Sequence, residues 1–177
     1  RPPQAVHANF WMSGLASVRH AFVDAGYQVL TERLDGVILA GSHAKLIRDA
    51  SVAYVRDDVD ESEQALHLAH ELGHLDLHLP HEACELDRTD LRPARSRALS
   101  RVEAYGPHER RELIANVYGR EFLLPRHLAR QLFIEEQLPA STIAERLGLP
   151  LAMVRQQLFD ALLPREAPGP RPNPPSK

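Results

Sequence analysis

Cysteine is nearly absent from this sequence, whose 177 residues include a single one, Cys84. A lone thiol cannot form an internal disulfide, which favours a reducing compartment. Long apolar runs are absent too, since no stretch approaches the roughly 18 residues that a membrane-spanning helix needs. No signal-peptide pattern is found at the start of the sequence. These absences predict a soluble cytoplasmic protein that has no membrane partner.

A large excess of charge of either sign is also missing. With 21 basic and 24 acidic residues, the net charge is −3, which disfavours a protein that mainly coats nucleic acid or an anionic membrane. Any basic contact surface must therefore be local. Segment 88–111 has seven arginines against three acidic residues, so it is either a solvated loop or a docking surface for an acidic partner or for phosphates.

The first half of the chain predicts a helix, a small sheet and a second helix. Ser13 is placed to cap the first helix. Between residues 27 and 56 the pattern changes to β-branched and alternating runs, one of them at 37–41, which indicate a small, mostly antiparallel sheet. A capping-box pattern at Asp60 predicts the start of a helix that Pro80 ends. The expected fold class is α+β.

The second predicted helix carries the sequence HELGH, in which His70 and His74 are four residues apart and Glu71 follows the first of them. Residues at this spacing lie about 6 Å apart on one helical face, so both imidazoles can bind one metal ion while the carboxylate reaches a water molecule beside it. His78 lies about 12 Å along the axis from His70, too far to share that ion. The three-histidine pattern HExxHxxGxxH also fails, because its last position is Pro80.

A third ligand is offered by a later helical stretch, which is expected between residues 109 and 124. Glu112 lies in it, Asn116 follows one turn later on the same face, and Leu113 is expected among its core contacts. Two histidines, one glutamate and an open fourth position are typical of hydrolytic zinc. One zinc ion is therefore expected, and manganese is the alternative for a ligand set that contains a carboxylate.

The order of these motifs, HELGH followed by an E-x-x-A-N helix that ends in EFLLP, resembles the ImmA/IrrE family of metallopeptidases. The resemblance covers residues 26–125 by order of elements and implies a gluzincin-like core, in which helices pack on a small sheet. It implies His70, His74 and Glu112 as metal ligands and Glu71 as general base. Proteins of this family are associated with proteolysis of transcriptional repressors in stress, DNA-damage and mobile-element responses.

Segment 102–125 also resembles, more faintly, versions of this domain that are fused ahead of UvrD-like DNA helicases. A fusion would suit the proline-rich residues 164–177, which are expected to form a linker or tail. The chain is thus expected to divide into a zincin-like core at 1–125, a three-helix subdomain at 126–163, and this tail. Gly119 stands where the family usually has an alanine, which leaves substrate preference open.

Other residues are candidates for supporting roles at the metal. Asn116 is a candidate to orient a ligand histidine through a hydrogen bond. The donor that stabilises the transition state is expected to be Tyr105, His108 or Tyr118, and the sequence does not choose among them. Cys84 is interpreted as a free thiol of a loop rather than as a metal ligand.

Residues 126–163 match the spacing of a helix-turn-helix, with Ser141 as N-cap and a turn at Gly148. The basic residues of this stretch are balanced by acidic ones, so counterion release would contribute little to DNA binding. We therefore expect direct DNA binding to be weak or absent, and a role in packing or partner docking.

Two functions from different classes remain open. The first is a metallo-endopeptidase that cuts an exposed loop or linker of a partner protein, with a DNA-bound repressor as the family-implied candidate. Its substrate would add as a strand to a free sheet edge, either that of the run at 51–58 or that of a neighbouring strand. The second is a non-catalytic interaction or DNA-tethering module whose metal stiffens the fold. Glu71 favours the enzyme, because a structural metal site has no use for that carboxylate.

Overall fold

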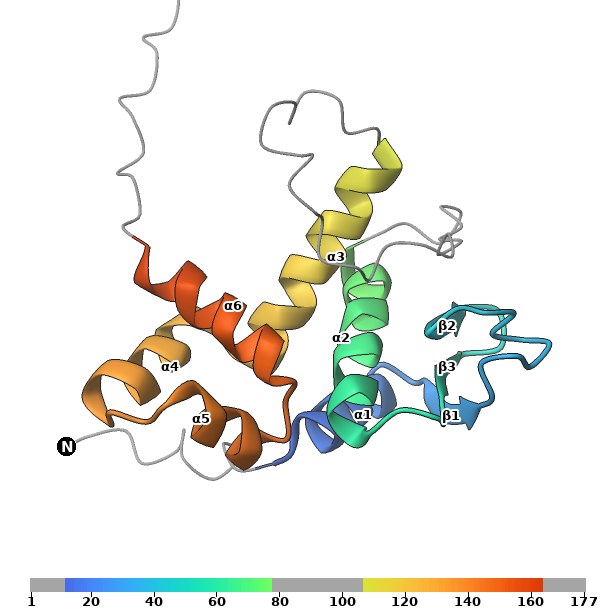
Figure 1. Ribbon diagram of the computed structural model, residues 1–177. Helices are drawn as coiled ribbons and strands as arrows, with labels where there is room; N and C mark the ends of the chain where they lie inside the picture. The colour runs from blue at the N-terminus through green and yellow to red at the C-terminus, as the bar shows by residue number, and fades with distance from the viewer. Residues whose placement is uncertain (1–11, 78–106, 164–177) are drawn as a thin grey trace, which may run out of the picture.

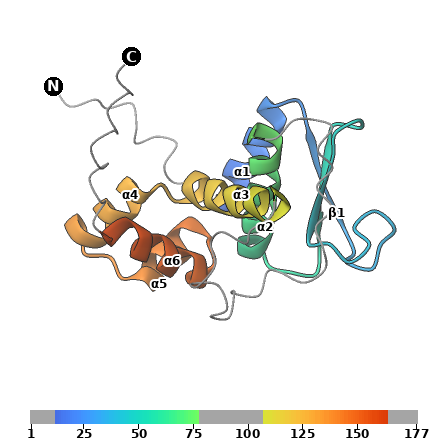
Figure 2. The same ribbon diagram turned by 90° about the horizontal axis from the view of Figure 1, so that it is seen from above.

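A mixed α+β fold is found in the computed structural model, which describes residues 12–77 and 107–163 (Figure 1). Six α-helices, one short π-helix and a three-stranded sheet make up this described part of the chain. The expected α+β class is confirmed. Viewed from above, helices α1, α2 and α3 lie between the sheet on one side and helices α4 to α6 on the other (Figure 2).

The starts of the first two helices follow from their capping residues. In α1 (Gly14–Asp24), the Ser13 hydroxyl accepts a hydrogen bond from the backbone N–H of Ala16 at 3.3 Å. In α2 (Glu61–Leu77), the Asp60 carboxylate accepts one from the backbone N–H of Glu63 at 3.0 Å. Each cap satisfies a backbone donor that has no partner within the helix. Both predicted helix starts are confirmed.

The sheet has the strand order β1-β3-β2, with β3 (Val52–Arg56) in the centre. Strand β1 (Gln28–Glu32) pairs with β3 in parallel, and β2 (Ala44–Ile47) pairs with it antiparallel. The expectation of a mostly antiparallel sheet is therefore wrong, because one of the two pairings is parallel. The run at 37–41, expected as a strand, lies instead in a turn where Ala40 and Gly41 have positive φ angles, and it forms part of the crossover that parallel pairing requires.

One face of the sheet packs on the helices. In β3, Ala53 and Val55 are fully buried, as the alternating pattern of this strand predicts. The neighbouring strands place further apolar residues on the same face because the register pairs them with these two positions. The residues that contribute to the core from this face are Val29, Ala44, Leu46, Ala53 and Val55. Helix α2 lies directly against this face, which brings its histidines near the sheet.

Helices α2 and α3 (Pro107–Leu123) approach each other so closely that glycine is required at two points of their crossing. A Cβ atom on Gly73 would lie 3.0 Å from the Cα atom of Ala115, and one on Gly119 would lie 3.0 Å from the backbone carbonyl carbon of Ala69. Both added atoms would meet backbone, which cannot rotate aside as a flexible side chain can. Gly119 therefore has a packing role.

Leu113 was expected in the core, and this expectation is wrong. Its side chain is 53% exposed, whereas Ala115 on the same helix is fully buried. The face of α3 that meets α2 is built from small residues, so a leucine two positions away from Ala115 points outward. Small size at the contact, rather than hydrophobicity, decides which side of this helix faces the core.

The C-terminal part is helical throughout. It consists of α4 (Arg126–Arg130), the π-helix η2 (Gln131–Glu135), α5 (Ala140–Leu147) and α6 (Leu151–Leu162). Between α5 and α6, Gly148 adopts a left-handed conformation with φ of 58°, which suits glycine at the end of a helix. The turn between the two helices is thus located where the sequence predicts it.

The apolar core continues from the N-terminal part into these helices. Leu15 of α1 and Leu68 of α2 belong to the same cluster as Val154 of α6. Ser141, predicted as an N-cap, lies inside α5, whose N-cap is Pro139. That expectation is wrong because the helix begins directly after the proline, whose fixed φ suits a helix start.

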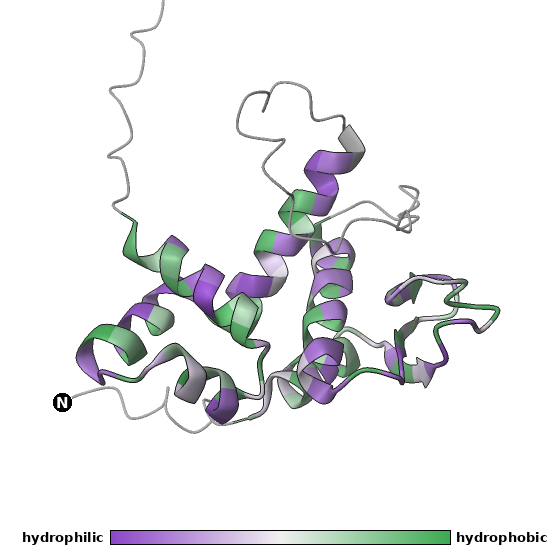
Figure 3. Ribbon diagram, in the orientation of Figure 1, coloured by the Kyte–Doolittle hydropathy of each residue, from purple (hydrophilic) through white to green (hydrophobic). Residues whose placement is uncertain are grey.

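Some hydrophobic residues remain exposed on η2 and at the end of α6, which are coloured green in Figure 3. They are Phe133, Ile134, Phe159, Leu162 and Leu163. Among the described residues, no helix is long and apolar enough to cross a membrane.

The close crossing of α2 and α3 gives a test of the packing. An exposed Gly→Ala change in a helix normally stabilises by about 0.5–1 kcal/mol, but Gly119→Ala should destabilise by about 1–3 kcal/mol because it forces the two backbones apart. Urea denaturation of the variant measures the difference. A neutral or stabilising effect would show that the helices can separate without cost.

Candidate metal centre

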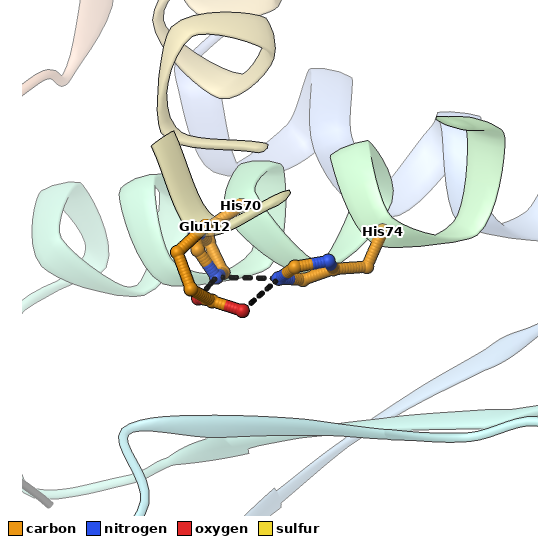
Figure 4. Close-up of side chains that lie close together, drawn as sticks. All are labelled: His70, His74 and Glu112. Carbon is orange, nitrogen blue, oxygen red and sulfur yellow. Dashed lines mark hydrogen bonds and ion pairs between the residues drawn. The ribbon is translucent and has the colours of Figure 1, made fainter. Parts of the chain in front are cut away.

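Three side chains from two helices converge on one point in the structure. His70 and His74 lie one turn apart on α2, and Glu112 reaches them from the first half of α3 (Figure 4). Each can supply one ligand atom, and these atoms all lie within 4.8 Å of one another. The cluster could hold a metal ion. The sequence-based choice of ligands is thus brought together by the fold.

The spacing of the ligand atoms fits tetrahedral zinc. Bonds of about 2.0–2.2 Å to zinc would place neighbouring ligand atoms about 3.3 Å apart. The Nε2 atom of His70 lies 3.2 Å from one oxygen of Glu112, and that of His74 lies 3.4 Å from the other. The two Nε2 atoms are 2.9 Å apart. Two imidazole nitrogens and a carboxylate thus face one another at distances that one shared cation would require.

Asn116 supports one of the ligands, as the sequence predicts. Its Oδ1 atom lies 2.9 Å from Nδ1 of His70. When Nδ1–H donates to this oxygen, the lone pair of the ring is left on Nε2, which faces the cluster. Burial opposes the charged form of His70, but the hydrogen bond that its ring donates to Glu112 and the negative charge of Glu71 outweigh burial and raise the pKa of this histidine. The position therefore attracts positive charge.

Glu71 is almost completely buried, with 3% of its surface exposed. Burial raises the pKa of its carboxyl group, and the nearby imidazoles of His70 and His74 act in the opposite direction. The backbone N–H of Leu46, in β2, also favours the charged form. A carboxylate with a raised pKa in a nearly dry site accepts a proton more readily than an exposed one. Glu71 thus has the properties that a general base needs.

Of the expected transition-state donors, Tyr118 is the one whose side chain the structure describes, and it is hydrogen-bonded to Asp76. The hydroxyl of Tyr118 donates to the carboxylate of Asp76, and burial together with this bond raises the pKa of the tyrosine to about 12. Tyr105 lies outside the described residues, and His108 is described only in its backbone, as part of α3. Cys84 also falls outside the described residues.

Most of segment 88–111 lies outside the described residues, as does the tail at 164–177. His78, which the sequence excludes as a ligand that shares an ion with His70, falls there as well. The roles expected for these residues stay predictions.

A second histidine pair, which sequence reasoning missed, lies one turn before the ligands. The ring of His67 contacts that of His43, with centroids 4.7 Å apart, and Nδ1 of His43 lies 2.9 Å from a guanidinium nitrogen of Arg56. The adjacent arginine disfavours a metal ion here. The spacing of His67 relative to His70 could have indicated that it shares the inward face of α2, but nothing in the sequence pairs it with His43.

Comparison with known proteins gives a fold but no family. No protein-family model and no curated protein match this sequence. A solved structure of a Mycobacterium tuberculosis transcriptional regulator is similar, with a TM-score of 0.59 and 18% sequence identity. The match covers 87% of this chain and 44% of the regulator, so this chain spans less than half of that protein's length. At this identity the similarity concerns the fold alone.

The ligand geometry predicts that the protein binds one divalent ion. Glu112→Ala should weaken zinc binding by at least about tenfold, because it removes the ligand that bridges both histidines. Glu109→Ala is the matched control, since it removes an exposed carboxylate one turn earlier on the same helix. Competition with a coloured chelator measures both affinities. If His78→Ala costs more affinity than Glu112→Ala, the ligand assignment is wrong.

The buried His67 predicts a pH-dependent stability of the metal-free protein. Burial, and then the nearby His43 and Arg56, lower the pKa of His67 from 6.5 to about 3. Between these values the unfolded chain binds a proton that the folded protein does not. Stability should therefore fall as the pH decreases, by at most about 1.4 kcal/mol per pH unit from this residue.

Urea denaturation between pH 7 and 4 checks this prediction. His67→Gln should reduce the slope, whereas His20→Gln, which changes an exposed histidine of α1, should leave it unchanged. An unchanged slope in the His67 variant would contradict the assignment of the proton to this residue.

Proposed function

We propose that this protein is a metal-dependent endopeptidase that cuts an exposed loop or linker of a partner protein. The observation that carries the proposal is the combination of three convergent ligands with a buried glutamate next to one of them in the sequence. A purely structural zinc site would normally close its fourth position with a protein ligand and would not need this glutamate.

The chemistry proposed for the site divides between the ion and the protein. A bound divalent ion would supply a Lewis acid that polarises a peptide carbonyl. Glu71 would take a proton from the attacking water molecule and return it to the leaving amine. His70, His74 and Glu112 would hold the ion, with Asn116 fixing the tautomer of His70.

A free strand edge beside the ligand helix supports binding of an extended peptide. Strand β3 was one candidate for this edge, but it is central, so within the described sheet the outer edges belong to β1 and β2. The backbone N–H of Arg56 donates to the carbonyl of His43, so these two residues form a hydrogen-bonded pair of the antiparallel ladder. Hydrogen-bonded and non-hydrogen-bonded pairs alternate along such a ladder. Ala44 and Leu46 are in the non-hydrogen-bonded pairs, so their backbone N–H and C=O groups point away from β3. The backbone N–H of Leu46 is also hydrogen-bonded to the carboxylate of Glu71. Of the two outer edges, that of β2 is therefore the one next to the site.

Such an edge selects the kind of substrate. A peptide that adds as a strand must be extended and unpaired, so loops and linkers are cut in preference to regular structure. The resemblance to the ImmA/IrrE family suggests a transcriptional repressor as the partner. The similarity of the fold to part of a protein titled a transcriptional regulator is in keeping with a role in gene control. A fusion to a UvrD-like helicase, and a position in the cytoplasm, also belong to this proposal.

The alternative is a non-catalytic module that binds a partner or tethers the protein to DNA. The exposed apolar residues on η2 and at the end of α6 favour contact with protein over contact with DNA. On α6, the exposed Arg155 is offset by Asp160, which also pairs with Arg120 of α3. Neither function requires strong DNA binding.

The proposal is tested by comparing new protein N-termini in cells that make the wild-type protein or its Glu71→Gln variant. The variant keeps a side chain of similar size but cannot accept the proton, so it should retain metal and lose cleavage. Cells are sampled at rest and under DNA damage. At least one terminus should be present with wild-type protein and absent with the variant.

Glu109→Gln serves as the matched control, because it changes an exposed carboxylate on α3 and should leave every terminus in place. Elemental analysis of the purified variants confirms that the metal is bound. If wild-type and Glu71→Gln cells show the same termini in both conditions, the peptidase proposal fails and the interaction module replaces it.

A further inference from the structure

Strand β2 is attached to helix α2 at both of its ends. At its start, the ring of His43 packs on the ring of His67, and Arg56 holds the other side of His43 at 2.9 Å. After its end, Arg48 crosses to the helix and donates from its guanidinium to the backbone carbonyl of His74 at 2.5 Å. The strand thus runs alongside the ligand helix, in the same direction, between two side-chain attachments.

The contact made by Arg48 lies near the C-terminal end of α2, at the backbone of a candidate metal ligand. His74 is in the last described turn of α2, and the helix dipole is negative at the C-terminal end of a helix. A guanidinium that donates to a backbone carbonyl there is favoured by this dipole. The same residue supplies a proposed metal ligand through its side chain. Arg48 therefore links the tip of the β2–β3 hairpin to the backbone of that ligand.

Between the two attachments lies the edge of β2 that no other strand of the described sheet pairs with, called here the free edge. Ala44 and Leu46 direct their backbone groups away from β3, and the N–H of Leu46 acts on the carboxylate of Glu71. The distance between this edge and Glu71 depends on how firmly the hairpin is held against α2. The attachment at Arg48 comes only two residues after Leu46, so it is the closer restraint.

We propose that Arg48 is a positioning residue that fixes the free edge of β2 against the ligand helix and so sets the groove in which an extended peptide would lie. The role of the groove rests on the proposed function, whereas the position of the edge does not. Arginine suits this role better than lysine, because its planar group can bond the carbonyl and still direct other N–H groups elsewhere.

Amide hydrogen exchange, measured by NMR on the zinc-loaded protein, tests this directly. Lys45 and Ile47 direct their N–H groups into the ladder with β3, so they report on the hairpin itself, whereas Leu46 reports on the free edge. Arg48→Met should speed exchange at Leu46 by about tenfold or more, with less than about a threefold change at its two neighbours. Arg48→Lys should restore part of the protection.

Arg33→Met is the matched control, since it removes an exposed arginine that pairs only locally with Asp35 among the contacts described for it. It should leave exchange at Leu46 unchanged. The proposal is overturned if Arg48→Met leaves Leu46 unchanged, or if all three amides of β2 accelerate together, because the residue then only stabilises the hairpin. Should Arg48→Met not fold, the lysine variant is judged by the same criteria.

The exchange measurement does not depend on peptidase activity. If cleavage is absent in cells but Arg48→Met loosens only the free edge, the proposed function fails and the positioning role stands. If cleavage depends on Glu71 but the edge is unaffected by Arg48, the reverse conclusion follows. The two proposals therefore fail separately.

Discussion

The close crossing of α2 and α3 is the constraint on which the rest of the structure depends. Gly73 and Gly119 allow each helix to touch the backbone of the other at Ala115 and Ala69. A carboxylate has a short side chain compared with the distance between ordinarily packed helices, so Glu112 can share an ion with two histidines only if the backbones are near. The convergence of these three side chains is therefore a consequence of helix packing as much as of their spacing in the sequence.

The sheet contributes a different constraint from the opposite side. It packs on the inward face of α2, where Glu71 is buried, and among the described strands its outer strand β2 lies beside that carboxylate. Burial and nearby charge then act against each other on the same group: the dry surroundings raise its pKa, and the histidines lower it. The peptidase proposal requires a general base whose pKa is set by such opposing effects. It also requires that this base, Glu71, lie next to a strand edge that can bind an extended peptide.

The sequence predicted which side chains come together, because helical periodicity alone places His70 and His74 on one face and Glu112 with Asn116 on another. That these side chains bind a metal ion stays a prediction. The sequence predicted the sheet poorly, since strand order and the direction of the β1–β3 pairing depend on contacts between distant segments. Leu113 and Ser141 show the same limit. Hydrophobicity suggested a core position for Leu113, but the packing of α3 against α2 leaves this side chain exposed. Capping chemistry suggested a helix start at Ser141, but the helix begins earlier, directly after Pro139.

The proposed site has three protein ligands that hold one ion and leave its fourth position open. It can be tested by a crystal structure of protein prepared without chelator, with anomalous scattering recorded at the zinc absorption edge. One peak is expected about 2.0–2.2 Å from Nε2 of His70, Nε2 of His74 and an oxygen of Glu112, with no protein atom in the fourth position. A peak elsewhere, or a fourth bond from a side chain such as that of Cys84, would contradict it.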